Sequence, residues 1–329
     1  MMQMIGYACA YVPVELLSAT GLRPYRLLHG DINLSKRGEK IVRVDACPMV
    51  KSNLTYVLEN EEKFAMLIGS TGCDMSRRMF DVLSERTSIP VYVVNNPRTD
   101  KPYIYSDEID WLVKQLESFS QIKYTDGIVK NEIDKWEGIR AELRKIDEER
   151  AACPSLVSTA DFHNVMTSYH QSSFDESATP RHDISEKPRV YLVGSAIAYE
   201  ANHILRLIEK KLRIVGDFNC GISRPLQIRI TEKSIAGIKH AYYQQPPCMH
   251  KRPHRKYYDF VGEQIIRLHC AGVIAWTLDY CDVYEFELRK IEKEFNLPTL
   301  RIRSDFSYQS NSQLWTRIEA FAEMLCSKT

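Results

Sequence analysis

Apolar runs and polar breaks along the chain predict the same strand–turn–helix unit twice. In the first unit, the apolar stretch 67–69 predicts a buried strand and the amphipathic stretch 74–83 predicts a helix. In the second unit, residues 273–278 predict a strand, and the apolar positions between 282 and 295 have helical spacing. A Cys-Asp pair lies between strand and helix in both units. The repetition predicts two related half-molecules.

The spacing after each cysteine supports this interpretation. Cys73 stands 17 residues before Pro90, and Cys281 stands 17 residues before Pro298; each proline opens a further apolar run. Each cysteine is therefore expected where a strand ends and a helix begins. In open parallel α/β sheets, ligands bind at this edge. We expect Cys73 and Cys281 to face each other across a cleft between two domains.

The remaining apolar runs alternate between strand and helix patterns. Strands are also predicted at 26–28, 89–94, 189–195, 214–217 and 297–302, and helices at 10–17, 48–58, 107–119, 132–150, 202–212, 228–243 and 312–325. This alternation predicts an α/β fold with doubly wound parallel sheets. The polar stretch 29–40 is predicted to be a loop, and 171–187 to be a linker or surface excursion.

These elements predict three regions. Residues 1–150 are expected to form an N-terminal α/β domain, 151–188 a helical or linker segment, and 189–329 a C-terminal α/β domain.

Composition argues against some classes of function and does not point to one. Lys and Arg (44) balance Asp and Glu (43), so the charge favours neither nucleic acid nor an anionic membrane surface. No apolar run reaches membrane-spanning length and the N-terminus has no signal-peptide pattern, so a cytoplasmic protein is expected. In a reducing cytosol the nine cysteines are not expected to form disulfides.

Five cysteines are predicted in loops beside helix starts or strand ends, where a core cysteine would be unusual: Cys47, Cys73, Cys220, Cys248 and Cys281. Cys270 and Cys326 suit an ordinary buried or helical position. No CxxC pair occurs, which argues against a structural zinc site, and the spacing typical of ferredoxins is missing too. Two interpretations of these cysteines remain: they are scattered buried thiols, or they are the ligands of one cluster and come from separate loops. Helix N-termini stabilise thiolates, which suits the second interpretation.

Ordered motifs then cover nearly the whole chain, at residues 9–17, 21–24, 46–52, 72–78, 280–287 and 313–321. Together they resemble the 2-hydroxyacyl-CoA dehydratase/benzoyl-CoA reductase family, D-component type, of iron–sulfur proteins. The resemblance implies two Rossmann-like domains with the cluster between them. It also implies that Cys47, Cys73 and Cys281 hold a [4Fe–4S] cluster with one iron open to water or substrate.

A subgroup of this family holds a double-cubane [8Fe–9S] cluster and needs additional thiolates. Cys47-Pro48-Met49-Val50-Lys51-Ser52 resembles the first motif of that subgroup, and Cys220 and Cys248 fall where its additional cysteines occur. After Cys248 the sequence departs from the subgroup, with a basic run at 250–255 in place of Pro-Asn and a later Arg.

The resemblance implies a redox function. An ATP-dependent iron–sulfur activator would supply low-potential electrons, which pass at the cluster to an acyl-CoA or a small unsaturated substrate. A double-cubane reductase is favoured, and a homodimer or a heterodimer with a related subunit is expected. The alternatives are a [4Fe–4S] subunit of a 2-hydroxyacyl-CoA dehydratase or benzoyl-CoA reductase, and a non-catalytic partner subunit. The chain has no P-loop, so it is not expected to hydrolyse ATP itself.

Two further features have both a functional and a structural interpretation. Glu15 matches the Pro-x-Glu element of the family, where a carboxylate could relay protons as a catalytic group, yet it also suits the dipole of a helix start. The basic run 250–256 could bind CoA phosphates or an acidic partner, or be a solvated surface segment.

Overall fold

Both predicted strand–turn–helix units are present in the computed structural model, which describes residues 3–152, 156–175, 187–307 and 311–327. Strand β3 (Phe64–Ser70) leads into helix α4 (Asp74–Arg86), and β7 (Gly272–Leu278) leads into α11 (Asp282–Phe295). The residues after Pro90 and Pro298 form β4 (Val91–Val94) and β8 (Thr299–Ser304). The repeated pattern in the sequence thus corresponds to a repeated structure.

The strands form two four-stranded parallel sheets with the same topology. The first has the order β2-β1-β3-β4 and adds β1 (Met4–Tyr7) and β2 (Arg23–Arg26). The second has the order β6-β5-β7-β8 and adds β5 (Arg189–Gly194) and β6 (Arg213–Asp217). The expected α/β class with two Rossmann-like sheets is therefore confirmed.

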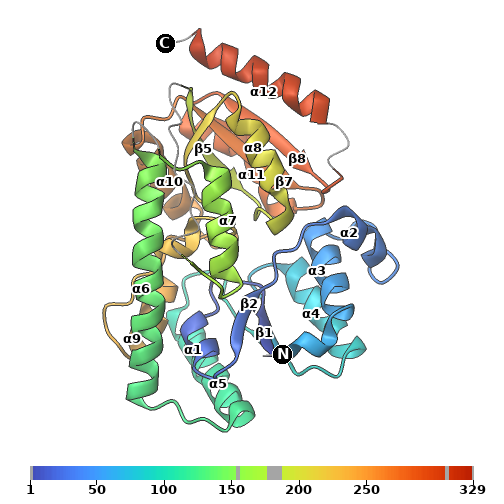
Figure 1. The fold of residues 1–329 in the computed structure, drawn as a ribbon, viewed down its shortest axis with the longest axis vertical. Coiled ribbons are helices and arrows are strands. Elements are labelled where there is room, and N and C mark those ends of the chain that lie inside the picture. The colour runs from blue at the N-terminus through green and yellow to red at the C-terminus, as the bar shows by residue number, and fades with distance from the viewer. Residues whose placement is uncertain (1–2, 153–155, 176–186, 308–310, 328–329) are drawn as a thin grey trace.

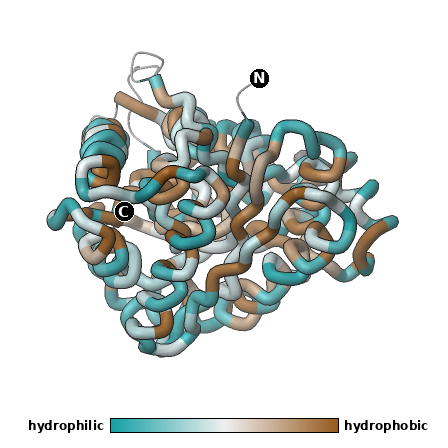
Figure 2. The backbone as a smooth tube through the Cα atoms, turned by 90° about the horizontal axis from the view of Figure 1, so that it is seen from below, coloured by the Kyte–Doolittle hydropathy of each residue, from teal (hydrophilic) through white to brown (hydrophobic). Residues whose placement is uncertain are grey.

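Helices surround both sheets (Figure 1). Figure 2 shows that these helices carry hydrophilic and hydrophobic stretches in turn, as amphipathic helices on a buried sheet do. They are α1 (Val14–Ser18), α2 (Ile32–Gly38), α3 (Pro48–Leu58), α5 (Pro102–Ser120), α6 (Asp126–Ala151), α7 (Thr159–His170), α8 (Asn202–Glu209), α9 (Ile235–Gln244), α10 (Arg255–Arg267) and α12 (Asn311–Cys326), with 3-10 turns at Glu61–Lys63, Tyr199–Ala201 and Arg224–Gln227.

The predicted loop at 29–40 is wrong, because it contains α2. The Asp31 side chain caps this helix by accepting the backbone N–H groups of Asn33 and Leu34. The helix then packs closely on α3: a Cβ on Gly38 would lie 2.7 Å from the backbone oxygen of Lys51. A capping aspartate and a glycine contact therefore form a helix where the polar composition indicated a loop.

The strand predicted at 26–28 lies earlier, at Arg23–Arg26. It includes Pro24, which a strand tolerates here because β2 is at the edge of its sheet. The apolar Leu27 and Leu28 are buried just after the strand, which explains the shifted prediction.

Helix α6 joins the two halves. It packs on α1 below the first sheet and on β6 of the second sheet, and Figure 1 shows it alongside both halves. Buried ion pairs hold it there: Arg140 Nη2 lies 2.5 Å from Glu15 Oε1, and Arg150 Nη1 lies 2.8 Å from Asp217 Oδ2. One hydrophobic cluster contains residues of both sheets. The two halves therefore share a core.

The division at residues 150 and 188 stays a prediction. The predicted linker 171–187 lies mostly outside the described residues, and so does Cys153. Within the described part of the chain, no helix has both the length and the apolar character needed to cross a membrane.

The Arg150–Asp217 pair yields a stability prediction. Because the Asp217 side chain is fully buried, Arg150→Met leaves its carboxylate without this partner and should lower the free energy of unfolding by about 3–5 kcal/mol. Chemical denaturation measures this loss. Lys130→Met, at an exposed position of the same helix, is the control and should change stability by less than about 0.5 kcal/mol. Equal losses in both variants would contradict the role given to the pair.

Candidate metal centre

Loops at the carboxyl ends of the two sheets meet around one cavity of about 170 Å³. Residues following β1, β2, β3 and β4 line it from the first half, and residues following β5, β6 and β7 line it from the second. The cavity has six cysteines in its wall: Cys9, Cys47, Cys73, Cys220, Cys248 and Cys281.

Three of these cysteines stand at helix N-termini and are called the helix trio: Cys47, Cys73 and Cys281. They are the N-cap residues of α3, α4 and α11. Burial, together with the neighbouring Cys281 and Cys73 thiols, raises the pKa of the Cys47 thiol to about 12. The backbone N–H groups of Met49 and Val50 act in the opposite direction. These helix ends therefore offer the partial positive charge that a thiolate needs.

The other three cysteines are called the arginine trio: Cys9, Cys220 and Cys248. Cys9 follows β1, Cys220 follows β6, and Cys248 follows α9. Burial raises the pKa of the Cys9 thiol, and the neighbouring Cys248 and Cys220 thiols add to this, whereas Arg224 opposes it. The six cysteines thus divide into two neighbouring sets of three.

The loop that carries Cys220 is fixed by its own sequence. Asp217 Oδ1 accepts the backbone N–H of Asn219 at 2.9 Å. Asn219 Oδ1 in turn accepts the backbone N–H groups of Ile197 and Gly221, each at 2.9 Å. A Cβ on Gly221 would lie 2.2 Å from the Ile197 carbonyl oxygen, so only glycine allows this approach. The buried Asp217 pair with α6 therefore also positions Cys220.

Two buried arginines line the cavity, and none of the carboxylates in the described part of the chain does. Arg26 and Arg224 are 2% and 1% exposed. Arg26 Nη1 donates to the Cys220 carbonyl oxygen at 2.5 Å, and Arg224 Nη1 lies 3.8 Å from the Cys220 sulfur. Among the described residues, neither arginine has a carboxylate within ion-pair distance, and neither Nε has a hydrogen-bond partner. A buried cation without a counter-charge is costly, so these arginines suit an anionic group in the cavity.

The donor set of the cavity is compatible with an iron–sulfur cluster. In a cubane cluster each cysteine binds a different iron, so the ligands come from separate positions around the cluster. Within the described ranges, no three Cys, His, Asp or Glu side chains form a group able to hold one metal ion, and six cysteines line the cavity.

The structure brings together all five cysteines that the sequence singled out. It adds Cys9, whose strand β1 has only four residues and was not predicted. The position of Cys9 just after a strand, like that of Cys73, is the feature that could have revealed it. Cys270 and Cys326 are not among the residues that line the cavity. The sequence also gave no indication of Arg26 and Arg224.

Glu15 lies outside the cavity lining. Its side chain is buried in the first turn of α1, where Tyr242 Oη donates to its Oε2 at 2.8 Å and Arg140 pairs with its Oε1. Its role as a proton relay stays a prediction. These two contacts give Glu15 a structural role, because they hold α6 and α9 against α1.

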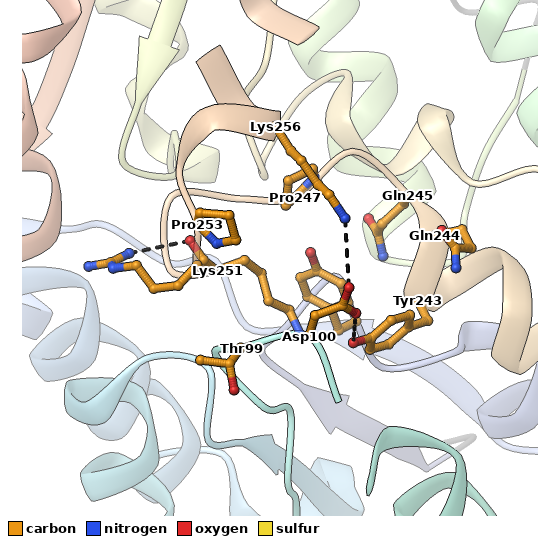
Figure 3. Close-up of a pocket in the computed structure, with 11 residues that line it drawn as sticks. Thr99, Asp100, Tyr243, Gln244, Gln245, Pro247, Lys251, Pro253 and Lys256 are labelled. Atoms are coloured by element: carbon orange, nitrogen blue, oxygen red, sulfur yellow. Dashed lines mark hydrogen bonds and ion pairs between the residues drawn. The ribbon is translucent and has the colours of Figure 1, made fainter. Parts of the chain in front are cut away.

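The basic run borders a second cavity of about 140 Å³, drawn in Figure 3. Lys251, Arg252 and Lys256 line it together with Asp100. Figure 3 shows Lys256 pointing toward Asp100, whose carboxylate also accepts the Tyr243 hydroxyl at 2.7 Å. Part of the run is therefore built into a pocket wall, although one carboxylate offsets its charge.

This second cavity adjoins the first. Tyr11 lines both of them. The Lys251 ammonium lies 4.6 Å from the centre of the Tyr11 ring and donates to the Pro97 carbonyl oxygen at 2.7 Å. Burial lowers the pKa of Lys251 to about 8, against the opposing effect of the Cys248 thiol. Lys251 therefore lies between the second cavity and the arginine trio.

Comparison with known proteins gives the family. The model for the 2-hydroxyglutaryl-CoA dehydratase D-component matches residues 9–325. The chain belongs to this family. The family resemblance predicted from the motifs is thus confirmed, and the matched range contains all six cysteines of the cavity.

Curated relatives of this family align with the chain over 98% of its length and 91% of theirs. YjiM of Escherichia coli K12, named as a dehydratase subunit, is 21% identical over 359 residues. The (R)-phenyllactyl-CoA dehydratase β subunit of Clostridium sporogenes is 23% identical over 345 residues. The lactoyl-CoA dehydratase β subunit of Anaerotignum propionicum is 21% identical over 348 residues.

The placement of Glu15 yields a prediction for this family member. Glu15→Gln removes the charge paired with Arg140, which keeps only Glu137, so the free energy of unfolding should fall by about 2 kcal/mol. Iron content after anaerobic reconstitution should not change, because Glu15 does not line the cavity. Glu142→Gln, on the surface of α6, is the matched control and should alter neither property. Loss of iron in Glu15→Gln would contradict this assignment.

Proposed function

We propose that this chain is an iron–sulfur redox protein that binds a double-cubane [8Fe–9S] cluster in the cavity, with one half on each cysteine trio. The observation that carries the proposal is the convergence of six cysteines on one cavity in two sets of three.

The number of thiols favours two cubanes over one. Three thiolates can hold one cubane and leave one iron open, whereas two bridged cubanes need about twice as many. A single cubane on the helix trio would leave Cys9, Cys220 and Cys248 without a function. Yet these three line the same cavity, beside buried arginines that have no carboxylate partner among the residues the structure describes.

The residues of the chain would each contribute to such a site. Helix N-termini favour the thiolate form of the helix trio, and Arg26 and Arg224 balance negative charge at the arginine trio. Apolar side chains in the wall, including Leu28, Val50 and Leu278, exclude water. When bound, the cluster supplies a low-potential electron store whose potential depends on charge, hydrogen bonds and burial.

The relatives support a reaction of the dehydratase class. We propose that the chain takes low-potential electrons from an ATP-dependent iron–sulfur activator and passes them to an acyl-CoA or a small unsaturated substrate. Because the relatives are named as subunits, a homodimer or a heterodimer with a related subunit is part of the proposal, and the cytoplasm is its proposed location.

A second candidate follows from the names of two relatives, which are β subunits of dehydratases. In this version the helix trio alone holds a [4Fe–4S] cluster, and the chain is one subunit of a 2-hydroxyacyl-CoA dehydratase or benzoyl-CoA reductase, or a non-catalytic partner in such an enzyme. Turnover with activator, ATP and reductant, but without a second subunit, would exclude the non-catalytic version.

Iron and sulfide quantitation after anaerobic purification tests the proposal. Wild-type protein should bind about eight irons per chain. Cys9→Ala, Cys220→Ala and the double variant should each lose about half of the iron, because they disrupt the same half of the cluster. Cys73→Ala should lose the other half, and Cys270→Ala, the matched control outside the cavity, should lose none.

Saturation near four irons, together with no effect of Cys220→Ala, would instead support the single-cubane subunit. Full retention of iron in both Cys73→Ala and Cys281→Ala would overturn the ligand assignment.

A further inference from the structure

Both arginines that line the cysteine cavity contact the arginine trio. Arg224 contacts the sulfur of Cys220, stacks over Tyr11 with 4.8 Å between its Cζ and the ring centre, and is 1% exposed. Arg26 donates to the backbone of the same Cys220. The Lys251 ammonium lies 4.6 Å from the centre of the same Tyr11 ring and is partly buried. Two buried arginines therefore contact one cysteine of this trio, and a partly buried lysine shares the Tyr11 ring with one of them.

The helix trio has different surroundings. Cys281 is the N-cap residue of α11 and is followed by Asp282 and Glu285. These two carboxylates lie in the first turn of α11, where they offset the partial positive charge of the helix end. Arg26 and Arg224, the two arginines of the cavity wall, both contact Cys220 of the other trio.

The different charges near the two trios predict different reduction potentials for the two halves of the cluster. A helix N-terminus is equivalent to roughly half a charge, and acidic residues oppose it at α11. A guanidinium carries a full charge, and its effect grows as burial lowers the effective dielectric constant. The reduction potential of an iron–sulfur cluster depends on net charge and on hydrogen bonds to its sulfurs, and nearby positive charge stabilises the reduced form. The half bound by the arginine trio should therefore have the higher potential.

We propose that Arg224, with Arg26 and Lys251, makes the half of the cluster bound by Cys9, Cys220 and Cys248 the first acceptor of an electron. The half bound by the helix trio keeps the lower potential and is the stronger reductant. The inference rests on the proposed double-cubane function. The step transfers one electron from a low-potential one-electron donor, which is oxidised, to iron, which is reduced, without a change in covalent bonds or protons.

Redox titration of the anaerobic holoprotein with titanium(III) citrate, followed by EPR and visible absorbance, should show two separate reduction waves. Arg224→Gln should shift the higher-potential wave to a lower potential and leave the other wave in place. Arg224→Lys keeps the positive charge, so its higher-potential wave should stay close to the wild-type potential. Arg229→Gln removes a charge from an exposed position five residues away and should shift neither wave.

A second variant marks the other half. Ser195→Ala removes a hydroxyl that lines the cavity with Cys281 and should lower only the potential of the lower-potential wave. Lys251→Gln, which leaves both arginines in place, should lower the higher-potential wave and carries the test if Arg224→Gln fails to retain iron.

The possible failures are distinguishable. A wild-type protein with about four irons and one wave would overturn both the proposed function and this inference. Eight irons, with no shift or with an equal shift of both waves in the charge-removing variants, would overturn this inference alone.

Discussion

Six thiols can reach one space only if the carboxyl ends of the two parallel sheets face each other, and the rest of the structure maintains this arrangement. Helix α6 holds both halves through buried pairs, Arg140 with Glu15 and Arg150 with Asp217. Asp217 also organises the loop that carries Cys220. The scaffold and the candidate site therefore depend on the same buried charges.

Much of the fold could be predicted because its local patterns are strong. The repeated strand-Cys-helix unit is long, apolar and followed by a proline at a fixed distance, so it defined both β3 with α4 and β7 with α11. The predictions for residues 29–40 and 26–28 were wrong because tertiary contacts there outweigh the local pattern of polar and apolar residues. The cap at Asp31 and the close packing of Gly38 form α2 within a polar stretch, and the edge position of β2 accommodates Pro24.

The candidate site could be predicted in part for the same reason. Cysteines at helix starts are visible in a sequence, which brought out Cys47, Cys73 and Cys281. Cys9 follows a strand too short to recognise, and its neighbours Cys220 and Cys248 are more than 200 residues away in the sequence. The arginines act through tertiary contacts, so no local pattern indicates that Arg224 lies beside the sulfur of Cys220 or that Arg26 contacts its backbone.

We propose that both trios bind iron. Anomalous scattering at the iron absorption edge, measured on anaerobically grown crystals, tests this directly. We expect two adjacent centres of iron density, one among Cys47, Cys73 and Cys281 and the other among Cys9, Cys220 and Cys248. A single centre at the helix trio, with free thiols at Cys9, Cys220 and Cys248, would contradict it.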